Sequence, residues 1–287
     1  MAAPMPQVDG VEHHYAQVNG FRMHYAEAGS GEPLILQHGW PQHWWMWRHQ
    51  IPPLAERYRV IVPDLRGYGW SEAPPRGYDK PQFAHDVVAL MDELGIERAR
   101  YAGHDWGAVA GYHLAIDHAE RFERIACLGA PPPWRKSPPP AQVVAVTIAY
   151  QGIISAPLLG SLAVRNGFAE TILKAGRQLG EFSAEEIRIY RDPLHEPGHD
   201  NASVQTYRTA LTRELPGSLR GGPSGRIGVP MLVMMGGAEL FVKVLDQEVV
   251  LRHADAEVTF DIVEGSGHFL PEEVSAHVTH ALLDLFA

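Results

Sequence analysis

Cysteine is almost absent from this sequence of 287 residues, and positive charge is in deficit. The single cysteine, Cys127, excludes an internal disulfide and a cluster of thiolate metal ligands. Lys and Arg number 24 against 34 Asp and Glu, which leaves a net charge of −10. An acidic surface repels phosphate backbones, so nucleic acid is not an expected partner. The first residues show no basic segment followed by an apolar run, so no signal peptide is visible and a cytoplasmic location is expected.

Charged residues are also missing from one long stretch, which raises the question of a membrane span. No Asp, Glu, Lys or Arg occurs between Ser137 and Val164. Prolines open this stretch, Gln142 and Gln151 interrupt it, and Pro157 would break a continuous helix. The sequence therefore predicts two apolar helices that cover an apolar site, and no membrane span.

Strand and helix patterns alternate through most of the chain, which predicts an α/β protein with a mostly parallel sheet and helices on both faces. The length is enough for one large core. Asn19-Gly20 between two short strand patterns predicts a hairpin, and short apolar runs that end at loops predict buried parallel strands. The expected strands are 15–18, 21–26, 33–37, 59–62, 98–102, 124–129, 229–235 and 258–263, and the expected helices are 83–94, 108–118, 244–253 and 271–286.

Two clusters of proline and glycine, at 131–140 and 216–228, interrupt this alternation. Between them the periodicity is helical only. We therefore expect one core with a helical insertion. Residues 1–133 form its first part, residues 134–222 form a helical cap (lid), and residues 223–287 form its second part.

A sharp turn between a strand and a helix carries the first candidate catalytic residue. Gly103-His104-Asp105-Trp106-Gly107 has the Gly-x-nucleophile-x-Gly form that α/β hydrolases place at this point. Asp105 occupies the nucleophile position, where serine and cysteine are the usual residues. A carboxylate with an ordinary pKa of ~3.9 is ionised at neutral pH and can attack an sp³ carbon without a base. The alternative role for Asp105 is that of a helix N-cap.

Two later loops supply an acid and a base in the chain order of the same fold. Glu239 follows the strand 229–235, and His268, in Gly265-Ser266-Gly267-His268, follows the strand 258–263. A catalytic histidine needs a carboxylate that fixes its tautomer. Glu239 is the first candidate for that carboxylate, and Asp246 is the alternative.

As a set, several motifs make the chain resemble the epoxide hydrolases of the α/β-hydrolase superfamily. They are His38-Gly39-Trp40-Pro41-Gln42, the segment 44–52, Asp64-Leu65-Arg66-Gly67-Tyr68-Gly69, and the turn at 103–107. The resemblance covers nearly the whole core and implies the α/β-hydrolase fold with an inserted cap. It also implies that the backbone N–H groups of Trp40 and Trp106 form an oxyanion hole.

The same resemblance implies that the cap supplies two tyrosines that hold the epoxide oxygen, because a leaving alkoxide needs a proton donor. Matching positions are Tyr150 and Tyr207, and Tyr190 is the reserve. Thr206, before Tyr207, stands where the family pattern has an aromatic residue. For both tyrosines the alternative is a packing role in the apolar cap.

The implied reaction is hydrolysis of an apolar epoxide to a vicinal diol. Asp105 forms an alkyl-enzyme ester, and water activated by His268 and Glu239 hydrolyses it. The partners are then a small apolar epoxide and water, with no metal and no organic cofactor. His195-Glu196-Pro197-Gly198-His199 matches a zinc-protease pattern, but Pro197-Gly198 would break the helix that this pattern needs.

Two other functions remain open at this point. A haloalkane or haloacid dehalogenase would use the same Asp105 nucleophile, although Trp40 stands where dehalogenases usually carry asparagine. A ligand-binding protein that kept the fold without catalysis is the second alternative, but its complete triad and turn glycines argue against it. The sequence leaves a homo-oligomer open.

Overall fold

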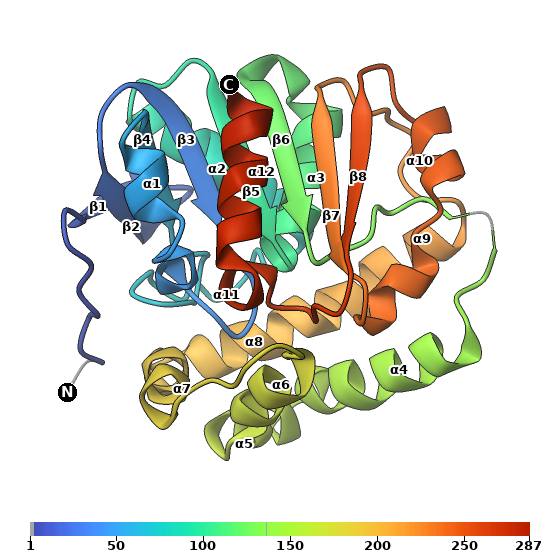
Figure 1. The fold of residues 1–287 in the computed structure, drawn as a ribbon. Coiled ribbons are helices and arrows are strands. Elements are labelled where there is room, and N and C mark those ends of the chain that lie inside the picture. Colours follow the sequence, from blue (N-terminus) through green and yellow to red (C-terminus); the bar gives the residue numbers. More distant parts are fainter. Residues whose placement is uncertain (1–2, 136) are drawn as a thin grey trace.

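The computed structural model describes residues 3–135 and 137–287. Its centre is a sheet with the strand order β1-β2-β4-β3-β5-β6-β7-β8 (Figure 1). The pairs β1·β2 and β2·β4 are antiparallel, and the other neighbours are parallel. The α/β class and the mostly parallel sheet are thus confirmed. The strands are β1 Glu12–Val18, β2 Phe21–Ala28, β3 Glu32–Gln37, β4 Tyr58–Pro63, β5 Ala99–His104, β6 Phe122–Leu128, β7 Met231–Gly236 and β8 Val258–Val263.

The hairpin between β1 and β2 forms where Asn19-Gly20 predicts it. Both residues have positive φ, 45° and 80°, which a tight two-residue turn requires. Val18 then pairs with Phe21, and this register buries Val18 and Phe21 in the core. The central strands are buried on both faces, as apolar parallel strands are.

Helices cover both faces of the sheet (Figure 1). On one face α2, α3 and α10 bury apolar side chains against the sheet, and on the other face α1 and α12 do so. The bounds are α1 Ile51–Ala55, α2 Lys80–Glu93, α3 Trp106–Asp117, α10 Gln247–Arg252, α11 Leu270–Glu273 and α12 Ser275–Phe286. The helix expected at 271–286 is thus two helices, because Val274 leaves the helical conformation with a φ of −132°.

Between β6 and β7 the chain runs through helices that lie together across one end of the sheet (Figure 1). They are α4 Ala141–Ser155, α5 Leu159–Arg165, α6 Phe168–Gly176, α7 Ala184–Arg191 and α8 His199–Thr209, whereas the last helix of the insertion, α9 Leu215–Leu219, lies beside α10. A π-helical segment, Ala210–Glu214, joins α8 to α9. The parallel strands β3 and β5 to β8 end where this group of helices begins, so loops that follow these strands face the insertion.

The uncharged stretch folds as two helices rather than one. The axes of α4 and α5 differ by 94°. Within the described residues, length and apolar composition pick out no single helix that could cross a membrane; α4 and α5 together pass the same test only as a bent pair.

Candidate active site

Asp105 lies in a strained turn between β5 and α3. Its φ and ψ are 54° and −116°, a sparsely populated conformation for a residue other than glycine. A Cβ atom added to Gly103 would lie 2.3 Å from the carbonyl oxygen of Gly107, and one added to Gly107 would lie 2.5 Å from that of Gln37. Both glycines are therefore required by close backbone packing. Asp105 precedes the first residue of α3, but its side chain makes no capping bond, so the N-cap alternative does not describe it.

The two carboxylate oxygens of Asp105 have different neighbours. The backbone N–H of Trp40 donates to Oδ1 at 2.8 Å, while Oδ2 lies 3.6 Å from Nε2 of His268. A Cβ atom on Gly39 would come within 2.2 Å of Oδ1, so this approach needs glycine. Burial alone would raise the pKa of Asp105, but His268 and the backbone N–H of Trp106 outweigh it and lower the pKa. The carboxylate is therefore ionised, with Oδ1 held and Oδ2 directed toward the imidazole.

His268 bridges Asp105 and Glu239. Its Nδ1 lies 2.8 Å from Oε1 of Glu239, whose loop follows β7, next to the strand β8 that precedes His268. Burial lowers the pKa of His268, but the two carboxylates outweigh burial and raise it to about 10. Burial also raises the pKa of Glu239, and the charge of His268 offsets part of that rise. The side chains of Asp105, His268 and Glu239 are 17%, 16% and 4% exposed, so the first two retain some access while the third is buried.

The two cap tyrosines lie next to each other and to the turn that carries Asp105. Tyr150 comes from α4 and Tyr207 from α8, and their ring centroids are 5.8 Å apart. The ring of Tyr207 also packs edge-on at 5.3 Å against Trp40 and at 5.3 Å against Trp106. Burial raises the pKa of both phenols, so both carry their protons at neutral pH. They are therefore available as hydrogen-bond donors next to the turn that carries Asp105.

The other residues that the sequence singled out are engaged elsewhere. Asp246 caps α10 by accepting a bond from Val249 N, and Glu239, not Asp246, contacts His268. The hydroxyl of Tyr190 binds Glu272 and accepts a bond from Arg48, so the reserve tyrosine belongs to a separate polar cluster.

Two histidines next to the candidate catalytic loops, His104 and His38, also have structural partners. His104 Nε2 donates to the carbonyl oxygen of His268 at 2.8 Å, and His38 Nε2 accepts from the backbone N–H of Leu65 at 2.9 Å. The zinc-like pattern is divided, because His195 ends a 3₁₀ turn and His199 begins α8 after Gly198 at a φ of 89°.

Sequence reasoning missed the contacts that join α8 to the core. Thr206 Oγ1 accepts a bond from Tyr68 at 2.8 Å, and Trp40 Nε1 donates to Ser203 Oγ at 3.0 Å. Lys80 Nζ donates to the carbonyl oxygen of Thr206 at 2.6 Å. The threonine at position 206, in place of the aromatic residue of the family pattern, was the available signal for such a contact, since a buried threonine hydroxyl needs a polar partner.

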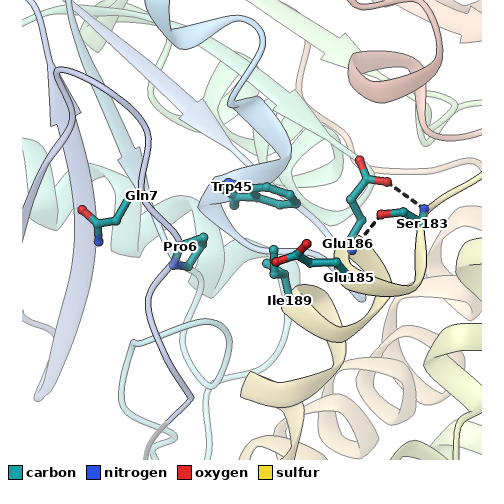
Figure 2. A pocket seen from close by; sticks show the side chains of 7 residues that line it. All are labelled: Pro6, Gln7, Trp45, Ser183, Glu185, Glu186 and Ile189. Carbon is teal, nitrogen blue, oxygen red and sulfur yellow. Dashed lines mark hydrogen bonds between the residues drawn. The ribbon is translucent and has the colours of Figure 1, made fainter.

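Figure 2 shows a separate surface pocket, between the N-terminal segment and α7. The dashed lines in it are the two hydrogen bonds by which Ser183 and Glu186 cap α7. None of the candidate catalytic residues contributes to it. The lining residues are Pro6, Gln7, Trp45, Ser183, Glu185, Glu186 and Ile189.

Fold and site together define a hydrolase of the α/β-hydrolase class. Residues 32–148 match the family model described as alpha/beta hydrolase fold. The chain is 35% identical to the soluble epoxide hydrolase of Corynebacterium sp. strain C12 over 96% of this chain and 98% of that protein. It is 32% identical to epoxide hydrolase A of Mycobacterium tuberculosis over 93% and 94% of the two chains. The chain belongs to the epoxide hydrolase family.

A solved structure agrees with this assignment. The epoxide hydrolase CorEH superimposes with a TM-score of 0.82 at 31% identity, covering 96% of this chain and 98% of that one. The expected resemblance and the expected α/β-hydrolase fold are therefore confirmed.

Proposed function

We propose that this enzyme hydrolyses an apolar epoxide to a vicinal diol through a covalent ester on Asp105. The observation that carries the proposal is the environment of one carboxylate. Asp105 is ionised, one of its oxygens is held by a backbone N–H, and the other is directed toward an imidazole, while the ring of Tyr207 packs against Trp106 of the same turn and against Tyr150. Serine-based ester hydrolysis would need a hydroxyl at this position.

In the first half-reaction, Oδ2 of Asp105 attacks an epoxide carbon and the ring C–O bond breaks. Tyr207 and Tyr150 donate hydrogen bonds to the oxygen as negative charge develops on it. That oxygen becomes the first hydroxyl of the product with a proton from the tyrosines, which solvent replaces. Asp105 is now a neutral ester, so His268 loses one of the two charges that raise its pKa. It releases its proton to solvent and becomes a base.

In the second half-reaction, neutral His268 takes a proton from water while the water oxygen bonds to Cγ of Asp105. Negative charge moves to Oδ1, where the N–H groups of Trp40 and Trp106 stabilise it. The Cγ–Oδ2 bond then breaks. The diol leaves with Oδ2 as the oxygen of its second hydroxyl and with the other water proton, and Asp105 regains its carboxylate with one oxygen from water.

The surroundings of the tyrosines favour an apolar substrate. Trp40, Trp106 and Tyr207 belong to one apolar cluster, which Tyr150 and Ile172 border from the cap. A charged substrate would have to give up its hydration against these apolar rings, which is costly. The cytoplasmic location and the cap bounds 134–222 remain predictions.

The test is the intact mass of the His268→Gln variant after exposure to a mixed pool of epoxides and haloalkanes. Without the base the ester should form and persist, so the expected adduct has the mass of a whole epoxide and is absent from Asp105→Asn. An adduct equal to an alkyl group without its halogen would instead assign a dehalogenase. No adduct with any member of a pool that spans small aliphatic to aromatic epoxides would overturn the ester mechanism.

A further inference from the structure

Both backbone groups of His268, its N–H and its carbonyl oxygen, hold the loop that carries the residue. The N–H of His268 donates to the carbonyl oxygen of Gly176, at the end of α6, at 2.7 Å. The carbonyl oxygen of His268 accepts from His104 Nε2 at 2.8 Å. A Cβ atom on Gly267 would lie 2.4 Å from the oxygen of Gly176. The loop of the proposed base therefore packs directly against the segment that follows α6.

One carboxylate joins these two segments. Glu273, at the end of α11, accepts hydrogen bonds from Gly267 N at 2.9 Å and Phe269 N at 2.9 Å, the two residues on either side of His268. It also accepts from Gln178 N at 2.8 Å and Leu179 N at 2.9 Å, which lie between α6 and α7. Three of these four donors converge on Oε2, and Phe269 alone uses Oε1.

We propose that Glu273 is a positioning residue that sets the place of His268 for the second half-reaction and ties it to the position of the cap. This inference rests on the proposed function. Four charge-assisted bonds from backbone N–H groups fix the carboxylate, and through Gly267 and Phe269 they fix the peptide that carries the imidazole. The base must hold its water within hydrogen-bond reach of Cγ of Asp105, so a small displacement of this loop is costly.

The two half-reactions depend on Glu273 to different degrees. Ester formation uses Oδ2 of Asp105 and the tyrosines on α4 and α8, and Glu273 touches none of these groups. Ester hydrolysis uses the imidazole, whose loop Glu273 holds. A defect at Glu273 should therefore slow hydrolysis of the ester and leave its formation unchanged.

The experiment measures the two half-reactions separately in the Glu273→Gln variant. An amide of the same shape has only one acceptor oxygen, so at least one backbone N–H loses its partner. Stopped-flow tryptophan fluorescence and quenched-flow intact mass, with an epoxide that labels His268→Gln, follow formation and loss of the adduct. The expected result is hydrolysis slowed by about tenfold or more, formation unchanged within about twofold, and adduct accumulating at steady state. Glu264→Gln, an exposed glutamate on the same connection between β8 and α11, is the matched control and should behave as wild type.

Unchanged hydrolysis would overturn the inference, and so would equal slowing of both steps, since a general loosening of the fold predicts the latter. If Glu273→Gln does not fold, Glu273→Asp is measured by the same criterion, because it keeps the charge but draws the oxygens back by one methylene. The proposed function is judged separately. It fails if His268→Gln forms no adduct, whereas an adduct on His268→Gln with normal hydrolysis in Glu273→Gln rejects only the positioning role.

Discussion

Lys80 offers the sharpest test of how the cap helix α8 is held above the nucleophile. Its side chain is fully buried, and its ammonium group donates to the carbonyl oxygen of Thr206 at 2.6 Å and to Thr209 Oγ1 at 3.3 Å. The ammonium also lies 3.2 Å from Glu214 and 4.2 Å from the centre of the Trp106 ring. One side chain thus joins the nucleophile turn to the helix turn that carries Tyr207.

Lys80→Met keeps most of the length of the side chain and removes its charge. Breaking a buried ion pair costs about 3–5 kcal/mol when the remaining charge stays buried. Removing the lysine also removes the cost of burying its ammonium group, which offsets part of this loss. Glu214 is 25% exposed and can be hydrated, which places the expected loss below this range. We expect a loss of about 2 kcal/mol, or a fall in Tm of about 4 °C for a domain of this size.

The activity of Lys80→Met should fall in the first half-reaction. With α8 less well held, Tyr207 meets the epoxide oxygen less often, so ester formation slows by about tenfold while ester hydrolysis keeps its rate. Single-turnover quenched-flow mass measurement separates the two steps, and calorimetry gives the Tm. Lys174→Met, at an exposed lysine of α6, is the control. Normal ester formation together with the expected fall in Tm would show that the lysine stabilises the fold without placing Tyr207.

Three further outcomes follow from the same site. His268 should stay protonated at pH 8 in the resting enzyme, and Glu239→Gln should lower its pKa; histidine NMR measures this on the signal that is absent from the spectrum of His268→Gln. Because the pKa of His268 in the folded protein is raised from 6.5 to about 10, its proton stabilises the fold below pH 6.5, and that stabilisation is lost as the pH rises toward 10. A single turnover in H₂¹⁸O should label Asp105 and leave the diol unlabelled; label in the diol would mean direct attack of water on the epoxide. Cys127 is buried, and burial raises the pKa of its thiol, so iodoacetamide should modify it only after denaturation, and rapid labelling of the native protein would contradict this.

Local patterns predicted the parts of the site that depend on short stretches of sequence. Gly103 and Gly107 indicate a turn too sharp for side chains. Asp105, Glu239 and His268 each stand shortly after a predicted strand. In the structure His268 lies 3.6 Å from Asp105 and 2.8 Å from Glu239. Such signals are visible because each one is contained in a few consecutive residues.

The parts that were missed depend on partners distant in sequence. Lys80 meets Thr206 across 126 positions, and Glu273 meets Gln178 across 95. The neighbouring residues in the sequence do not distinguish a buried lysine from an exposed one. They also do not distinguish a glutamate that accepts four backbone hydrogen bonds from one that accepts none. The sequence leaves the choice between Glu239 and Asp246 open for the same reason, since both follow β7 and only packing shows which of them reaches the imidazole.

The order of the strands along the chain also determines when each proposed catalytic group appears during synthesis. The proposed nucleophile follows β5, whereas the acid and the base follow β7 and β8, after all of the inserted helices. A ribosome that adds about 5–20 residues per second needs roughly ten to thirty seconds for the intervening stretch of about 160 residues. For that time a nascent chain holds the group that would accept an alkyl substituent but not the one that would remove it. On the proposed mechanism, an ester on Asp105 can therefore be hydrolysed only in a chain in which the strand before His268 has been made and folded.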